Sequence, residues 1–220
     1  MSVGVLHILL ACLIPVAFLL GSVPTGVLIA RKRGVDLRSV GSGNVGATNV
    51  GRALGKRFFF VVLALDAFKA FLPSMAASLL VLLSTEPADR SALTFGLWIA
   101  VGVAAVCGHV FSPFLKFKGG KGVACGLGLV LGIFPYLTVP GVLGLLVFIA
   151  VFKLSRYVSL GSIVGAASLP IWYLIAAWGL NWSLERQWPV LALLTLAAGL
   201  LIWRHRENVR RLLAGTEGKT

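Results

Sequence analysis

Three glycines in the stretch GSGNVGATN, residues 41–49, follow the spacing G-x-G-x-x-G. In soluble enzymes this spacing is typical of dinucleotide-binding loops, where an acidic residue about 20 positions later binds the ribose. Asp66 stands at that distance from Gly46. The loop therefore has the residue types to bind a phosphate group, and the sequence around it must indicate which kind of phosphate site it forms.

The surrounding sequence argues against a Rossmann enzyme. Asp66 lies within the apolar run FFFVVLALDAFKAFLPSMAASLL, whereas a ribose-binding acid stands at a water-accessible strand end. Only 12% of the 220 residues are charged, about half the share found in a soluble domain. Apolar runs of roughly 20 residues, enough to span a bilayer, recur along the chain. The sequence predicts an all-α integral membrane protein in which the glycine loop remains a candidate phosphate site.

Within this loop, Gly41, Gly43 and Gly46 allow positive φ angles and a close approach between backbone and ligand. Turns of that kind aim successive N–H groups at an anion, so residues 42–49 are expected to form an anion-binding nest. The alternative is an irregular loop whose polar residues only cap helices and whose charges face lipid headgroups.

A helix is expected to follow the glycine loop as far as Arg57. Thr48 or Asn49 is expected to cap it, and the partial positive charge at its N-terminus favours a bound phosphate. Arg52 would then lie in the first turn, where its guanidinium group can bind phosphate with two hydrogen bonds.

A second glycine motif, KFKGGKGVACGLG, contains Lys121 directly after Gly119 and Gly120. An apolar run follows, so Lys121 is also expected at a helix start. The motif is not an ATP-binding P-loop, because no serine or threonine follows the lysine. Lys116 and Lys118 are expected to be lysines that only snorkel to the membrane boundary. For Lys121, phosphate binding and membrane anchoring both remain open.

Two further polar segments are SRYVSLGSI and RHRENVRRL. In the first, Ser159 and Ser162 would share one helix face, where their hydroxyls either donate to a phosphate or bond back to helix carbonyls. In the second, His205 and Asn208 would share a face that is either directed into the protein or part of a basic, membrane-proximal tail.

Other titratable groups in the apolar runs are expected to be structural. Asp66 and Lys69 are three residues apart and should form an ion pair, although charges within a membrane can also mark function. His109 is expected to be a packed, hydrogen-bonded residue. No cysteine spacing suggests zinc or a disulfide framework, and so no metal site is predicted; the cysteines are Cys12, Cys107 and Cys125.

The number of membrane spans depends on the stretch 123–152, which is either one tilted helix or two short helices separated within GIFPYLTVPG. Two helices would place 17 of the 20 Lys and Arg residues on one side of the membrane. The positive-inside rule then favours seven transmembrane helices, two of them short, with the N-terminus outside and the C-terminus in the cytoplasm. All belong to a single domain, residues 1–220. The other spans are expected at 3–30, 58–84, 91–115, 159–180 and 189–203.

In this order, the motifs GSGNVGATNVGRALGK, KFKGGKGVA, RYVSLGSI and RHRENVRRLL resemble the bacterial acyl-phosphate:glycerol-3-phosphate acyltransferase family. The resemblance covers nearly the whole chain. It implies seven spans in the bacterial inner membrane and an active site at the cytoplasmic face. It also implies transfer of a long-chain acyl group from acyl phosphate to the 1-hydroxyl of sn-glycerol 3-phosphate, which gives lysophosphatidic acid and inorganic phosphate in phospholipid synthesis. No cofactor and no nucleic-acid partner are expected, and the protein is expected to be a monomer.

The residue types fit a reaction that brings two phosphates together. The neutral backbone nest suits the acyl phosphate, and the cations suit glycerol 3-phosphate. Because phosphate is a good leaving group, positioning and electrostatic stabilisation should dominate, with a substrate phosphate oxygen or His205 as the proton acceptor. The catalytic residues are predicted to be Ser42, Asn44, Arg52, Lys121, Ser162 and His205. Substrate binding is predicted for Gly43, Val45, Gly46, Ala47, Thr48, Asn49, Gly119, Gly120 and Asn208.

The rival hypothesis is a transporter or channel for a phosphorylated metabolite, because broken helices and helix N-termini also bind anionic cargo in transporters. The two hypotheses differ in outcome: an enzyme makes a new ester, whereas a transporter moves its substrate unchanged.

Overall fold

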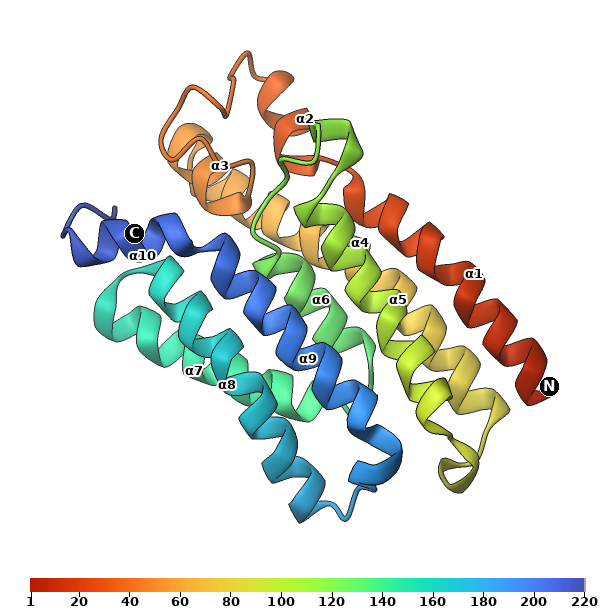
Figure 1. Cartoon of the computed structure of the whole chain (residues 1–220). Helices are drawn as coiled ribbons and strands as arrows, with labels where there is room; N and C mark the ends of the chain where they lie inside the picture. Colours follow the sequence, from red (N-terminus) through yellow and green to blue (C-terminus); the bar gives the residue numbers. More distant parts are fainter. Residues whose placement is uncertain (220) are drawn as a thin grey trace.

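The computed structural model describes residues 1–219 and, over that range, consists of α-helices and two short 3-10 turns (Figure 1). The all-α prediction is therefore confirmed. The helices are α1 (Val3–Ser22), α2 (Thr25–Arg31), α3 (Ala47–Leu54), α4 (Lys56–Ser84), α5 (Ala92–Val110), α6 (Val123–Gly132), α7 (Thr138–Ser155), α8 (Val158–Gly179), α9 (Leu184–Arg204) and α10 (Arg206–Leu213).

Six helical segments of the described chain are long and apolar enough to cross a membrane. The first of them runs from Val3 to Arg31 and combines α1 with α2. The other five correspond to α4, α5 with the 3-10 turn after it, α7, α8 and α9. The composition of the chain and the lengths of its helices thus agree on an integral membrane protein.

The ambiguous stretch 123–152 forms two helices, α6 and α7, which are separated at Ile133–Leu137. Only α6 is short: its 10 residues correspond to about 15 Å of helix. The expectation of two short helices is corrected at α7, which has 18 residues. Pro140 does not interrupt α7 because it lies in the first turn, where the missing N–H of proline has no helical partner to lose.

The first span is broken between α1 and α2, and two charged side chains of α4, Asp66 and Lys69, bind the polar groups at this break. The helix stops at Val23, and the carbonyl oxygen of Val23 accepts a hydrogen bond from Lys69 Nζ at 2.8 Å. Lys69 also lies 2.8 Å from Asp66 Oδ1, which in turn accepts from Thr25 Oγ1 at 2.5 Å. The expected Asp66–Lys69 pair is present, and it satisfies main-chain and side-chain polar groups on both sides of the break, as a membrane interior requires.

Small residues allow α1 and α5 to pack closely. A Cβ atom on Gly21 would lie 2.0 Å from the carbonyl oxygen of Ala105, and one on Gly108 would lie 2.1 Å from that of Phe18. Such close backbone contact between helices is typical of membrane proteins, where it replaces the hydrophobic driving force that water provides elsewhere.

The polar motifs gather at one end of the bundle. Figure 1 shows α3, the loop between α5 and α6, the turn between α7 and α8, and α10 at the end opposite to the N-terminus. The N-terminus lies at the other end with the loops 85–91 and 180–183. Helix packing has therefore brought four motifs that are far apart in the sequence to one side of the molecule.

Candidate active site

The glycine loop differs from its predicted form at the start of the following helix. Gly41 and Gly43 have φ angles of 55° and 66°, as expected, but Gly46 has a φ of −82° and is the N-cap of α3. Thr48 and Asn49 therefore lie inside the first turn and do not cap the helix. The expected helix as far as Arg57 is also corrected, because α3 ends at Leu54. Arg52 therefore lies in the last turn of α3 and not, as predicted, in its first turn.

The side chain of Asn49 braces the loop instead of capping the helix. It is only 2% exposed. Its Oδ1 accepts from the N–H of Ser42 at 2.9 Å, and its Nδ2 donates to the carbonyls of Leu37 and Val40, both at 3.1 Å. Gly41 leaves room for this contact, since a Cβ there would lie 2.3 Å from Asn49 Oδ1.

Internal hydrogen bonds determine which N–H groups of the loop are free to bind an anion. The N–H groups of Ser42, Gly43 and Gly46 donate within the loop, to Asn49, Val40 and Asn44 respectively. Among residues 42–49, four N–H groups make no hydrogen bond to the described part of the protein; they belong to Asn44, Val45, Ala47 and Thr48. The nest is therefore narrower than predicted and leads into the N-terminus of α3.

The lysine motif meets the C-terminal motif directly. Lys121 Nζ donates to Asn208 Oδ1, and the amide nitrogen of Asn208 donates to Glu217 Oε1 at 2.7 Å. Burial is the main cause that lowers the pKa of Lys121 to about 8, and the nearby Arg211 guanidinium adds to it. Lys121 and Asn208, which the sequence analysis predicted as site residues, are therefore in contact, and the Glu217 carboxylate binds Asn208 in turn.

Glu217 is a site residue that the sequence analysis missed. Its carboxylate accepts from Ser159 Oγ at 2.9 Å and from Arg211 Nε at 2.7 Å, in addition to Asn208. Burial alone would raise the pKa of Glu217, but hydrogen bonds from Arg211, Asn208 and Ser159 outweigh that effect and lower it. The available signal was a lone acidic residue in the basic segment RRLLAGTEGKT.

The C-terminal segment also reaches Arg52, which donates from NH2 to the carbonyl of Gly218 at 3.0 Å. Arg52 is exposed otherwise, so its guanidinium group lies at the open side of the cluster. Ser162 is buried, but its hydroxyl donates back to the carbonyl of Val158 at 2.8 Å. Of the two α8 serines in the motif SRYVSLGSI, Ser159 is the one that contacts the C-terminal segment.

His205 lies between α9 and α10 and is 3% exposed. Its Nδ1 lies 2.8 Å from the carbonyl oxygen of Leu201, and burial lowers its pKa to about 4. The imidazole is therefore neutral near pH 7. With its proton on Nδ1, directed at that carbonyl, Nε2 is left as a hydrogen-bond acceptor.

Gly119 and Gly120 have a packing role that explains why both are glycine. A Cβ on Gly119 would lie 2.0 Å from the carbonyl oxygen of His109, and one on Gly120 would lie 2.1 Å from His109 Nε2. The loop therefore rests directly on the end of α5, and Lys121 follows at its edge.

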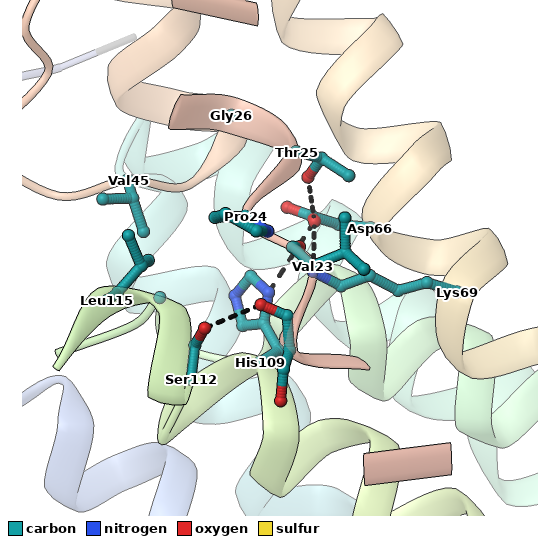
Figure 2. A pocket seen from close by; sticks show the side chains of 12 residues that line it. Val23, Pro24, Thr25, Gly26, Val45, Asp66, Lys69, His109, Ser112 and Leu115 are labelled. Atoms are coloured by element: carbon teal, nitrogen blue, oxygen red, sulfur yellow. Dashed lines mark hydrogen bonds and ion pairs between the residues drawn. The ribbon is translucent and has the colours of Figure 1, made fainter. Parts of the chain in front are cut away.

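Beneath this loop is a small pocket between the break in the first span and the side chains of Asp66, Lys69 and His109 (Figure 2). His109 Nδ1 lies 3.7 Å from Asp66 Oδ1, and Cys125 Sγ donates to the main-chain carbonyl of Asp66 at 3.0 Å. Asp66, His109 and Cys125 are close enough together to be considered as metal ligands. The ammonium group of Lys69 already pairs with the Asp66 carboxylate, and His109 links this cluster to the loop above it.

The sequence matches the family model described as glycerol-3-phosphate acyltransferase over residues 10–215. The chain belongs to the glycerol-3-phosphate acyltransferase family. The matched region contains all four polar motifs and ends just before Glu217.

Individual members of the glycerol-3-phosphate acyltransferase family align over almost their full length. The chain is 46% identical over 206 residues to the family member of Geobacter sulfurreducens, covering 93% of this chain and 94% of the relative. It is 42% identical over 201 residues to that of Aquifex aeolicus, covering 91% and 94%.

The fold of a solved family member is also similar. A crystal structure of PlsY (YgiH), an integral membrane glycerol 3-phosphate acyltransferase in its glycerol 3-phosphate form, superposes with a TM-score of 0.81 at 39% identity. The match covers 96% of this chain and 95% of that one. A second structure, the lysophosphatidic acid form, matches with a TM-score of 0.78.

Proposed function

We propose that this protein transfers a long-chain acyl group from acyl phosphate to the 1-hydroxyl of sn-glycerol 3-phosphate. The observation that carries the proposal is the presence of unpaired loop N–H groups, a partly buried lysine and a neutral histidine at the same end of a membrane bundle. Membership of the family supports the same reaction. The products are lysophosphatidic acid and inorganic phosphate, as in the first acylation of phospholipid synthesis.

The chemistry needs no covalent enzyme intermediate. The 1-hydroxyl oxygen attacks the acyl carbon and forms the new ester bond, while the bond between that carbon and the phosphate oxygen breaks. The phosphate leaves with the electron pair, and one of its oxygens accepts the hydroxyl proton. His205 has a pKa of about 4, which makes it a weak base but a suitable acceptor to orient the hydroxyl. Positioning and charge stabilisation then supply most of the catalysis.

Each phosphate has a set of donors suited to it. The free N–H groups before and within the first turn of α3 suit the acyl phosphate, because neutral donors bind an anion without adding a counter-charge. Lys121 and Arg52 suit the phosphate of glycerol 3-phosphate, and Asn208 holds the Lys121 ammonium group. The donor's acyl chain would remain in the adjacent hydrocarbon, and no cofactor takes part in this scheme.

We propose seven membrane crossings, with the N-terminus outside and the active site at the cytoplasmic face of the bacterial inner membrane. The support is the path of residues 123–137. This segment begins after the lysine loop (residues 116–122), and Tyr136 lies near its far end. The Tyr136 hydroxyl accepts from Arg90 and its ring packs against Trp182; these two residues belong to the loops at the opposite end of the bundle. Helix α6 and the irregular stretch after it therefore cross the bundle together, and the basic clusters share one side.

The reaction is tested with purified protein in lipid vesicles, given palmitoyl phosphate and glycerol 3-phosphate. Release of inorganic phosphate together with acylated product supports transfer, whereas uptake of glycerol 3-phosphate without product supports the transporter hypothesis. Palmitoyl-CoA in a parallel assay tests the choice of donor. The oligomeric state, proposed to be a monomer, is measured on the same preparation by light scattering in detergent.

Replacing Asn49 with alanine is expected to lower kcat/KM for acyl phosphate about 10- to 100-fold. The change leaves the Ser42 N–H and the carbonyls of Leu37 and Val40 without their partner, and each lost bond costs about 1 kcal/mol. Initial rates against acyl-phosphate concentration measure the effect. An unchanged KM and kcat for acyl phosphate would show that the loop does not depend on this brace.

The activity is expected to fall above pH 8. A lysine binds phosphate only when protonated. With its pKa lowered to about 8, Lys121 has lost half of its charge at pH 8 and most of it by about pH 9, where an ordinary lysine is still charged. The dependence of kcat/KM for glycerol 3-phosphate on pH reports this group in the free enzyme. The Lys121→Arg variant should not show this fall in kcat/KM at alkaline pH. If the variant shows the same fall at the same pH, the titrating group is a residue other than Lys121.

Substitutions of His205 separate its two possible roles. If it orients the hydroxyl as an acceptor, His205→Gln should keep turnover within about 10-fold, since the amide oxygen can accept in place of Nε2, while His205→Ala should lose more. Turnover with saturating substrates gives the comparison. Loss of all turnover in both variants, with substrate binding intact, would instead make His205 the base and overturn proton transfer to the substrate phosphate.

A further inference from the structure

The lysine loop is held by two arginines that lie outside the predicted site. Arg38 NH2 donates to the carbonyl of Lys118. Arg204 NH2, at the end of α9, donates to the carbonyls of Gly119 at 3.1 Å and Gly120 at 3.4 Å. Three successive carbonyl oxygens of the loop are therefore bound by guanidinium groups that come from two distant parts of the chain.

The N–H groups of Gly119 and Gly120 are bound by the end of α5, whereas their carbonyl groups are bound by Arg204. Gly119 N–H donates to the carbonyl of Val110, and Gly120 N–H donates to that of His109, both at 3.1 Å. All four polar main-chain groups of the pair thus have a partner. Glycine has the largest conformational freedom of any residue, so these four bonds, together with the His109 ring beneath Gly120, fix the position from which Lys121 extends.

The arrangement brings positive charges together. Within the described residues, neither Arg38 nor Arg204 forms an ion pair, and the two lie close enough for their charges to interact. Arg204 is half-buried, where repulsion between cations is screened less than in water. The loop carbonyls are what these guanidinium groups bind, so their main effect falls on the segment that precedes Lys121.

We propose that Arg204 is a positioning residue for glycerol 3-phosphate binding: it clamps the Gly119–Gly120 carbonyls and thereby places the Lys121 ammonium group beside the bound phosphate. This inference rests on the proposed function, in which Lys121 binds that phosphate. Arg38, which lies in the segment before the glycine loop, binds the preceding carbonyl group of the lysine loop, that of Lys118. The clamp therefore also couples the two phosphate sites through the chain that connects them.

A double-mutant cycle tests whether Arg204 acts through Lys121. Arg204→Gln is expected to raise KM for glycerol 3-phosphate about 10-fold with kcat within about 3-fold, because a loosened loop weakens binding in the ground state and transition state alike. In a Lys121→Met background the same change should cost less than about 3-fold, since the positioned group is already gone. Arg204→Lys, which keeps a charged donor at this place, should restore most of the wild-type KM.

Arg206→Gln is the matched control. It removes the same charge two residues away. Arg206 is exposed, and within residues 1–219 its side chain donates only to the nearby carbonyl of Trp203, on whose ring it also stacks. This variant should leave KM for glycerol 3-phosphate unchanged.

Hydrogen exchange gives a readout that does not depend on activity. Amides of the Lys118–Val123 peptide should exchange about 10-fold faster in Arg204→Gln than in wild type, and at the wild-type rate in Arg206→Gln. Equal exchange in all three proteins, or fully additive kinetic effects in the cycle, would overturn the clamp. If the wild type shows no acyl transfer, the proposed function fails while the exchange measurement still decides whether Arg204 orders the loop.

Discussion

Lys121→Met is expected to lower kcat/KM for glycerol 3-phosphate about 100-fold or more. The ammonium group is partly buried and held by Asn208 Oδ1, so its hydrogen bond to a phosphate is charge-assisted and poorly screened. Such bonds contribute about 1.5–3 kcal/mol, and the loss of a full charge beside a dianion adds to this. Methionine keeps the length and apolar stem of the side chain, so the loop and α6 should remain folded.

Steady-state rates at varied glycerol 3-phosphate measure this effect, with Lys118→Met as the matched control. Lys118 lies on the same loop, but its side chain is exposed, and its hydrogen bonds within residues 1–219 are made by its main-chain groups. The control should retain wild-type rates. If Lys121→Met behaves like the control, Lys121 is an interfacial anchor, as its place at the membrane boundary also allowed.

Arg52→Ala is the second substitution with a large expected effect, about 10- to 100-fold in KM for glycerol 3-phosphate. In the structure its guanidinium group donates to the carbonyl of Gly218, a weaker acceptor than a phosphate oxygen. A phosphate at the open side of the cluster can therefore take over this donor and accept two hydrogen bonds from the same group. Alanine removes both bonds and the charge.

Arg57→Ala is the control for Arg52, because it removes an exposed arginine from the first turn of the next helix. The same rate measurements against glycerol 3-phosphate apply. A normal KM in Arg52→Ala would remove Arg52 from the binding site and leave it as a contact that only holds the C-terminal segment.

These two cations reach the same cluster from separate parts of the chain, and the C-terminal segment joins them. Glu217 holds Asn208, which holds Lys121, and the next residue, Gly218, contacts Arg52. The segment therefore connects the lysine loop to α3. The Glu217 carboxylate also offsets part of the positive charge that would otherwise accumulate there before a substrate phosphate binds.

The sequence by itself determined the class of the protein and the chemistry available to it. Hydropathy and the scarcity of charge indicated the membrane setting and the helical fold directly. The break within residues 123–152 was predicted only from the distribution of the basic residues between the two sides. The resemblance of four motifs identified the family, and family membership is now confirmed. Asp66 and Lys69 could be paired from their spacing because three residues along a helix place side chains on one face.

Only the tertiary structure decided which groups are free to act. Local sequence does not show that Asn49 accepts the hydrogen bond of the Ser42 N–H. Nor does it show that Ser159 rather than Ser162 contacts Glu217, or that Arg204 binds the carbonyl groups of the glycine pair. The last two contacts join residues 58 and 85 positions apart, and they exist only because helix packing brings the ends of α5, α8 and α9 together. A hydrogen-bond donor is available to a substrate only if no closer partner takes it, and which partner is closer depends on packing across the whole bundle.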